Sequence, residues 1–248
     1  MDRSLYIAMS GAKQTMLAQT SNANNLANAQ TIGFKSDFEQ FRSMPVFGPG
    51  QPTRVYAMAE NPGTNFTPGS IQTTGRDLDI AIDGEGWLAV LDSNGQESYT
   101  RAGDLRVTPE GFLQTGRGEP VLGDDGPIVI PATDKIEIGG DGTVSIIPLG
   151  EEDATTLLKV DRLKLVNPNV ANLEKLGDGL MHLKPGNQLP FADARVSITP
   201  GSLESSNVGA VAAMVEMIEL ARNFELQVKV MKSADENSGA AAKILQMS

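Results

Sequence analysis

The residue types that most often carry chemistry are scarce in this 248-residue chain. It contains no Cys and a single His, His182. Thiolate zinc sites, Fe–S clusters and cysteine nucleophiles are therefore excluded, and neither a His-based metal site nor a Ser-His-Asp triad is expected. We interpret His182 as a packing or surface residue rather than a catalytic base.

Acidic and glycine-rich stretches offer weaker candidates for metal or nucleotide binding. Asp77, Asp79 and Asp83 suggest a calcium loop, but Ala81 and Ile82 stand where an EF-hand needs an oxygen ligand and a glycine. The glycines near residues 116–118 and 139–142 lack the remainder of a dinucleotide or phosphate loop. We therefore predict turns at these places, with no metal, no cofactor and no catalytic residue.

One enzymatic alternative stays open. Carboxylates are plentiful, with 31 Asp and Glu, so a glycosidase-type pair is compatible with the composition. A secreted, acidic, β-rich, carbohydrate-active enzyme is thus the rival from another class. One Trp and three Tyr are few for a cleft that stacks on sugars.

The charge balance excludes several partners. The net charge is −11, whereas nucleic-acid binding and adhesion to anionic membranes need a basic surface. No stretch of about 20 apolar residues is present, so no membrane insertion is expected. The short apolar run Leu5–Met9 is soon followed by Lys13, which does not fit the apolar core of a secretory signal.

Proline, glycine and charge divide the chain into two ends and a middle. All 14 Pro lie between Pro45 and Pro200, and of the 26 Gly only Gly11 and Gly239 lie outside 32–210. Helix interiors tolerate these residues least, so the ends are predicted to be helical and the middle turn-rich. The two ends together are close to neutral, which leaves the negative charge in the middle.

A helix is predicted from about residue 3 to 29 and another from about 208 to 245. Apolar residues recur in both at steps of three and four, which is typical of a coiled-coil-like seam with a polar break at Gln19. We predict that these helices pair and form an assembly interface between subunits. The residues assigned to it are Leu5, Met9, Ala12, Met16, Ala23, Leu26, Val211, Val215, Ile218, Leu220, Phe224 and Val228.

The middle is predicted to be mainly antiparallel β-structure. Apolar segments such as 87–91 alternate with frequent turns, of which Asn94-Gly95 is the strongest hairpin signal. The fold class is therefore α+β, and the stretch 43–70, rich in Pro, Gly and Thr, is predicted as an extended connection. The expected domains are an N-terminal helix (1–35), a connector (36–70), a β-rich outer domain (71–204) and a C-terminal helix (205–248).

A motif at the end of the first predicted helix resembles a known family. Residues 24–35 read Asn-Asn-Leu-Ala-Asn-Ala-Gln-Thr-Ile-Gly-Phe-Lys, similar to the signature of flagellar basal-body rod proteins, the rod and hook axial proteins. Asn28 suits a helix end, Gly33 permits a turn, and Phe34 fixes the chain as it leaves the helix. The motif residues are Asn24, Asn25, Leu26, Ala27, Asn28, Gly33, Phe34 and Lys35.

Three further segments extend the resemblance along the chain. They are Leu-Asp-Ile-Ala-Ile-Asp-Gly-Glu-Gly-Trp at 78–87, Tyr-Thr-Arg-Ala-Gly at 99–103 and Gly-Ser-Leu-Glu-Ser-Ser-Asn-Val at 201–208. The start of the chain and the segment 220–229 resemble the proximal-rod members in particular. Four motifs in order are far more specific than one.

The resemblance implies a structural subunit of the flagellar rod, which crosses the periplasm and transmits torque from motor to hook. Its partners would be copies of itself, other proximal- and distal-rod subunits and the type III export apparatus, through which it would leave the cell without signal cleavage. The terminal helices would form the inner tube, and the β domain would face outward. A distal-rod or hook subunit of the same family is the alternative within this class.

Overall fold

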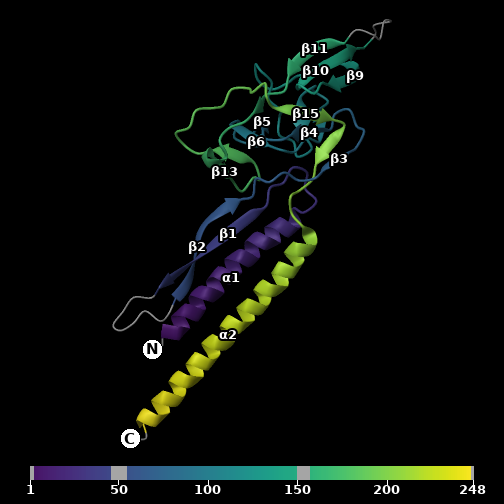
Figure 1. Cartoon of the computed structure of the whole chain (residues 1–248). Helices are drawn as coiled ribbons and strands as arrows, with labels where there is room; N and C mark the ends of the chain where they lie inside the picture. The colour runs from purple at the N-terminus through teal and green to yellow at the C-terminus, as the bar shows by residue number, and fades with distance from the viewer. Residues whose placement is uncertain (1–2, 46–54, 150–156, 247–248) are drawn as a thin grey trace. The chain divides into compact units, whose positions relative to one another are not determined.

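The computed structural model of the protein in Figure 1 describes residues 3–45, 55–149 and 157–246. Helices lie at both ends of the chain, and the strands between them are paired antiparallel. The chain is thus an α+β protein, as its composition predicts.

The described residues separate into two units. The helical unit takes its residues from 1–29, 36–65 and 208–248, and the β-rich unit consists of 30–35 and 66–207. This division differs from the expected domains at two places. Residues 30–35 belong with the strands, and most of the expected connector belongs with the helices.

The helical unit is built on α1 (Arg3–Ala27) and α2 (Ala210–Gln246), each within two residues of its predicted ends. The helices lie side by side and run in opposite directions (Figure 1). The Asn22 side-chain amide donates to the Ala213 carbonyl at 2.7 Å, and a Cβ on Gly11 would contact the Gln227 side chain. These two contacts fix the register of the pair.

Small side chains form the buried face of α1. Its buried apolar residues are Ala8, Ala12 and Ala18, whereas Met9 and Met16 are 55% exposed. The face buried within the chain thus shares Ala12 with the predicted interface and leaves the two methionines on the surface. Small residues permit close approach of helix axes, because the separation depends on the side chains at the contact.

The expected extended connection contains a β-hairpin. Strands β1 (Asp37–Pro45) and β2 (Val55–Thr64) pair antiparallel and pack along α1 (Figure 1). The Asn25 side chain joins the helix to the hairpin, because it donates to the Asp37 carbonyl at 2.6 Å and accepts from the Asp37 amide at 2.8 Å. Residues Asp37–Pro45 and Val55–Thr64 of the expected connector are therefore paired strands rather than an unpaired linker.

The β-rich unit contains a five-stranded sheet, a three-stranded sheet and three strand pairs. In the five-stranded sheet the order is β12-β5-β6-β14-β13, in the three-stranded sheet β11-β10-β9, and the pairs are β15-β4, β16-β3 and β7-β8. The bounds are β3 (Ile71–Thr73), β4 (Ile80–Asp83), β5 (Trp87–Leu91), β6 (Glu97–Thr100), β7 (Leu105–Val107), β8 (Leu113–Thr115), β9 (Thr133–Ile138), β10 (Thr143–Pro148), β11 (Leu158–Arg162), β12 (Leu165–Val166), a 3-10 turn (Val170–Asn172), β13 (Leu173–Lys175), β14 (Met181–Leu183), β15 (Ser197–Pro200) and β16 (Ser202–Glu204).

Both faces of the five-stranded sheet are covered. Leu88 and Val90 of β5 enter the larger apolar cluster, whereas Trp87 and Ala89 enter a second one. Successive side chains of a strand point to opposite faces, so a strand buried on both sides is apolar throughout. This explains the unbroken run of residues 87–91.

The predicted turns lie at strand ends. Gly95 has a φ of +75° between β5 and β6, and the Asn94 amide donates to the Asp92 carboxylate at 2.8 Å.

Among the described residues, neither terminal helix combines the length and the apolar character that a bilayer-spanning segment needs.

Candidate assembly surfaces and the ionic junction

One face of α2 is partly buried within the chain. Its least exposed residues recur at steps of four and three, the spacing that keeps side chains on one side of a helix. Leu220 and Phe224, two of the predicted interface residues, belong to this face. The face contains Ala213, Met217, Leu220, Phe224, Gln227 and Met231.

The other predicted residues of α2 form an open apolar stripe. Val211 is 76% exposed, Val215 52% and Ile218 59%, and Val228 is exposed as well. Valine and isoleucine are among the residues most often fully buried in proteins, so a helical row of them in contact with solvent is unusual. We call Val211, Met214, Val215 and Ile218 the open stripe.

The predicted residues of α1 divide in the same way. Ala12 is buried, and Leu5 and Leu26 are partly buried. Met9, Met16 and Ala23 are exposed. The structure therefore brings part of the predicted set together within one chain and leaves the rest on the surface.

Helix α2 continues beyond the described part of α1. It has 37 residues against 25, and the contacts of Asn22 and Gly11 align Arg3 with a residue near 235. The last turns of α2, about 16 Å at 1.5 Å per residue, therefore extend past that end, and residues 235–243 are exposed. We call residues 236–246 the α2 extension.

In the β-rich unit, the motif segments come together around one buried carboxylate. Glu204 accepts from the Lys35 ammonium at 2.7 Å and from the Arg101 guanidinium at 2.8 Å. The side chains of Lys35 and Glu204 are 1% exposed and that of Arg101 is 6% exposed. We call these three residues the ionic junction.

Backbone hydrogen bonds hold the same segments together. The Gly33 amide donates to the Glu204 carbonyl at 2.8 Å, and the Asn207 amide donates to the Phe34 carbonyl at 3.2 Å. Gly33 has a φ of +66°, and a Cβ there would collide with the backbone of Arg101. A glycine is therefore required by both conformation and space.

Arg101 makes further contacts with the motif at 78–87. Its guanidinium donates to the Gly84 carbonyl at 2.7 Å and lies 5.5 Å from the centre of the Trp87 ring. Phe34 is also covered by a cation, since the Lys175 ammonium lies 3.8 Å from its ring and donates to the Lys35 carbonyl. All four motifs thus meet in one place.

The charges of the junction shift its proton equilibria. Burial by itself raises the pKa of Glu204, but the Lys35 hydrogen bond, the Arg101 charge and the Gly69 amide outweigh it and lower that pKa below its ordinary value. Burial lowers the pKa of Lys35, and the Glu204 hydrogen bond opposes this. The lowered pKa means that the carboxylate stays ionised to a lower pH than an ordinary glutamate.

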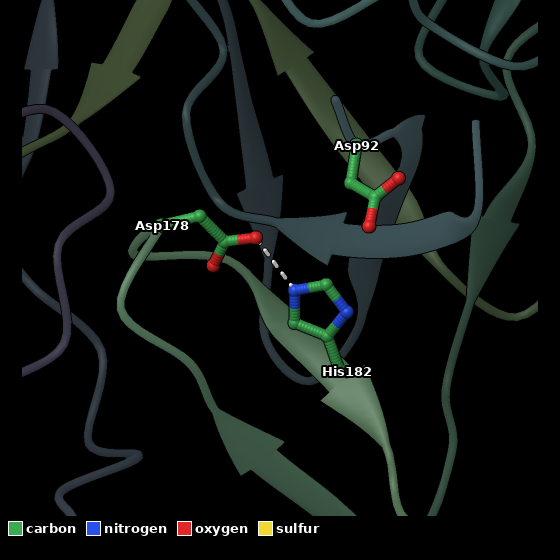
Figure 2. Close-up of side chains that lie close together, drawn as sticks. All are labelled: Asp92, Asp178 and His182. Carbon is green, nitrogen blue, oxygen red and sulfur yellow. Dashed lines mark hydrogen bonds and ion pairs between the residues drawn. The ribbon is translucent and has the colours of Figure 1, made fainter. Parts of the chain in front are cut away.

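A second polar cluster combines the turns that follow β5 and precede β14 with a residue of β14 itself. Asp92, Asp178 and His182 each place one potential ligand atom within 4.8 Å of the others (Figure 2). The His182 Nε2 atom lies 2.8 Å from Asp178 Oδ2, and its Nδ1 atom lies 3.1 Å from the Ser98 hydroxyl. Asp92 accepts from two backbone amides of its own turn. These hydrogen bonds account for the position of each group as part of turn and cross-strand packing.

The earlier acidic candidates do not resemble such a cluster. Asp79 is buried, where it accepts from the Thr74 hydroxyl at 2.7 Å and pairs with Arg76 at 3.3 Å. Asp77 and Asp83 are exposed.

Sequence reasoning missed the pairing of Glu204 with Arg101 and Lys35. The signal was present, because each charged residue stands within a family-like motif that is otherwise largely uncharged. Long charged side chains are almost never fully buried unless paired. What the sequence lacked was any indication that segments 103 and 169 residues apart would meet.

Two family profiles match parts of the chain. Residues 199–244 match "Flagellar basal body rod FlgEFG protein C-terminal", and residues 81–146 match "Flagellar hook protein FlgE/F/G D1 domain". The first covers most of α2, and the second begins in β4.

Full-length relatives are also found. The flagellar basal-body rod protein FlgF of Escherichia coli strain K12 is 43% identical over 253 aligned residues, covering 100% of both chains. The FlgF protein of Caulobacter vibrioides is 34% identical, covering 99% of this chain and 98% of the relative. The flagellar basal-body rod protein FlgG of Bacillus subtilis strain 168 is 32% identical, covering 94% and 96%.

Proposed function

Because the chain belongs to the family of flagellar basal-body rod proteins, it is a structural rod subunit, and we propose that it builds the proximal rod through its two terminal helices. The observation that carries this mechanism is the open stripe of α2. A structural role needs apolar surface that one chain leaves uncovered and neighbouring chains can bury. The proximal position is supported by the 43% identity to FlgF of Escherichia coli, against 32% to FlgG of Bacillus subtilis.

The occupants of the open stripe are helices of adjacent rod subunits, including copies of this chain. Met9 and Met16 of α1 offer exposed apolar side chains of the same kind. Each large apolar side chain that becomes fully buried contributes about 1.5–3 kcal/mol. A helix with one face on its own chain and another on a neighbour is the unit from which a coiled-coil-like tube is built.

Assembly also stabilises the helical conformation of the two ends of the chain. Fixing a residue's backbone costs about 1–2 kcal/mol, and a helix pair with an alanine face buries little apolar surface to offset that cost. We infer that the terminal helices are weakly ordered in the dilute monomer and gain order when subunits associate. Far-UV circular dichroism that shows full, protease-resistant helicity in the dilute monomer would contradict this inference.

The α2 extension supports contact along the rod as well as around it. Its exposed turns include Ala240, Ala241 and Ala242, whose small side chains permit a neighbouring helix to approach closely. Because this segment projects past the described part of α1, it can reach a subunit in the next layer.

Charge favours this arrangement. Residues 1–35 carry three basic groups and one acidic group, and residues 205–248 carry four basic and five acidic groups, so the ends can approach one another with little repulsion. The negative charge of the chain resides in the remaining residues, which suits a solvated outer surface. Delivery across the inner membrane by the type III export apparatus, without signal cleavage, and torque transmission across the periplasm complete the proposal.

The test is a charge placed in the open stripe. Val215→Asp should leave Trp87 fluorescence and monomer solubility unchanged, yet abolish incorporation into basal bodies and motility. Val170→Asp is the matched control, because Val170 is 47% exposed in the β-rich unit, close to the 52% of Val215. Incorporation of the Val215→Asp protein at the control level would refute assembly through the stripe.

A second variant tests the part of the proposed interface that α1 contributes. Leu26→Asp should permit export but block completion of the rod, because it places a charge on a partly buried side chain of the helix. Normal motility of this variant would contradict the packing role of Leu26.

A further inference from the structure

The chain passes between its two units at four points, and the ends of these connections gather inside the β-rich unit. The crossings lie at 29–30, 35–36, 65–66 and 207–208. Within the β-rich unit, the adjoining segments are 30–35, those following residue 65, and those preceding residue 208. Every covalent path to the helices therefore leaves through these three segments.

Hydrogen bonds tie the three segments to one another. The Lys35 ammonium donates to the Thr67 carbonyl at 3.0 Å, and the Asn207 side-chain amide donates to the same carbonyl at 3.0 Å. The Gly69 amide donates to a Glu204 carboxylate oxygen at 2.8 Å. The Glu204 side chain thus bonds to both of the other segments, through Lys35 and Gly69, and the Lys35 side chain likewise bonds to both, through Thr67 and Glu204.

We propose that Glu204 is a positioning residue that holds the three connecting segments together. Ionisation of this one carboxylate keeps the three segments in contact with one another. While the ionic junction is intact, the three segments from which the connections to the helices leave keep fixed positions relative to one another. Without the carboxylate, the segments separate locally so that Lys35 and Arg101 can reach water. Fixed positions of these segments matter for torque transmission only through the proposed function, on which that consequence rests.

The charges of the ionic junction are unequal. In the ionic junction one carboxylate faces two cations, and all three side chains are almost fully buried. Loss of Lys35 leaves a balanced pair of Arg101 and Glu204. Loss of Glu204 leaves two buried cations with no carboxylate, and removal of one partner from a buried pair is strongly destabilising.

Of the three junction residues, Arg101 contacts an apolar cluster, through the Trp87 ring. The apolar clusters around Leu88 and Trp87 consist of residues from many strands and include neither Lys35 nor Glu204. Opening is therefore expected to be local, because the cheapest way to hydrate the cations is to release short connecting segments rather than the sheets.

The experiment is site-resolved amide hydrogen exchange on the full-length protein. Glu204→Gln keeps the shape of the side chain and removes its charge. The exchange rates of the Gly33, Gly69 and Asn207 amides should rise on the order of 100-fold, as expected for loss of a buried charge pair. The amides of Ala89 and Val121, which donate to Lys164 and Leu113 carbonyls, should keep their rates.

Two matched variants separate charge balance from general weakening. Lys35→Met should raise the exchange of the Gly69 and Asn207 amides less than about 10-fold, because a one-to-one pair remains. Glu97→Gln removes the 2.7 Å pair with Lys164, whose side chains are 11% and 20% exposed, and should leave the junction amides unchanged.

Three outcomes would overturn the proposal. They are unchanged exchange in Glu204→Gln, equal effects of Glu204→Gln and Lys35→Met, and a uniform rise at Ala89 and Val121, which would make Glu204 a general stability residue. None of these results bears on assembly through the open stripe, which the Val215→Asp variant tests separately.

Discussion

The helical unit and the β-rich unit treat their large apolar side chains in opposite ways. In the β-rich unit, Leu88, Leu105 and Leu113 are at most 1% exposed. In the helical unit, the buried apolar positions of the described residues belong to alanines, and Met9 and Ile218 are more than half exposed. The β-rich unit is therefore stabilised from within, whereas the helices carry their most favourable contacts on the surface that a neighbour would cover.

This difference shows how one chain can combine a stable domain with an assembly element. Burial stabilises a fold in proportion to the apolar area removed from water. A helix pair in which α1 contributes an alanine face gains little area on its own, and α2 leaves the valines and isoleucine of the open stripe for other chains. Substitutions in the two units should consequently affect different measurements.

The largest effect is expected from a cavity in the β-rich core. Leu113→Ala should lower the free energy of unfolding by about 3 kcal/mol, because Leu113 is fully buried in the larger apolar cluster. Denaturation followed by fluorescence of Trp87, the single tryptophan, reports on this unit. Val215→Ala in the open stripe should change the free energy of unfolding by less than about 0.5 kcal/mol. Equal losses in both variants would erase the contrast between the units.

A somewhat smaller loss of stability is expected at Gly33, a motif residue that packs against the backbone of Arg101. Gly33→Ala should destabilise the β-rich unit by about 2 kcal/mol, since the residue has a positive φ and a Cβ would collide with Arg101. Gly84→Ala is the control for conformation alone, because Gly84 also has a positive φ but no atom within 4 Å of the added Cβ. Similar Trp87 denaturation curves for the two variants would show that close packing at Gly33 adds nothing.

Within the helical unit, Asn22→Ala should cost about 1 kcal/mol of helix-pair stability. The variant removes a buried hydrogen bond to the Ala213 carbonyl. Thermal loss of far-UV circular dichroism measures this change, and the exposed Asn24→Ala in the same helix serves as the control. Identical melting of the two variants would mean that Asn22 does not fix the register.

The smallest effect, of opposite sign, is expected at Asp104. Burial raises the pKa of this carboxyl, and the charges of Asp79 and Glu119 raise it further. A carboxyl whose pKa rises on folding destabilises the folded state above that pKa, and the penalty disappears as the pH falls through it. Asp104→Asn should therefore stabilise the β-rich unit at neutral pH by less than about 1 kcal/mol and lose this advantage in acid.

Asp141 offers the reverse case. Hydrogen bonds from the Thr143 hydroxyl and amide lower its pKa, so ionised Asp141 favours the folded state. Asp141→Asn should weaken the β-rich unit at neutral pH and approach the parent protein in acid. If both variants shifted stability in the same direction, the assigned electrostatic causes would be wrong.

Several elements could be predicted from local sequence. The absence of proline from the ends predicts the helices, and Asn94-Gly95 predicts the turn between β5 and β6, because these preferences act over a few residues. The hairpin β1–β2 was not predicted, since its proline- and glycine-rich sequence suits turns and linkers equally. Met9 and Met16 were assigned to the assembly interface, and hydrophobic periodicity alone did not indicate that alanines would form the face of α1 buried within the chain.

The sequence by itself determined the α+β composition, the positions of helices and turns, and the four motifs that indicate the family. Only the tertiary structure decided that Glu204 would neutralise Lys35 and Arg101, residues 169 and 103 positions away. It also decided which apolar side chains meet α1 and which form the open stripe. The physical reason is that backbone preferences and hydrophobic periodicity are local, whereas the partner of a buried charge depends on which distant segments the completed fold brings into contact.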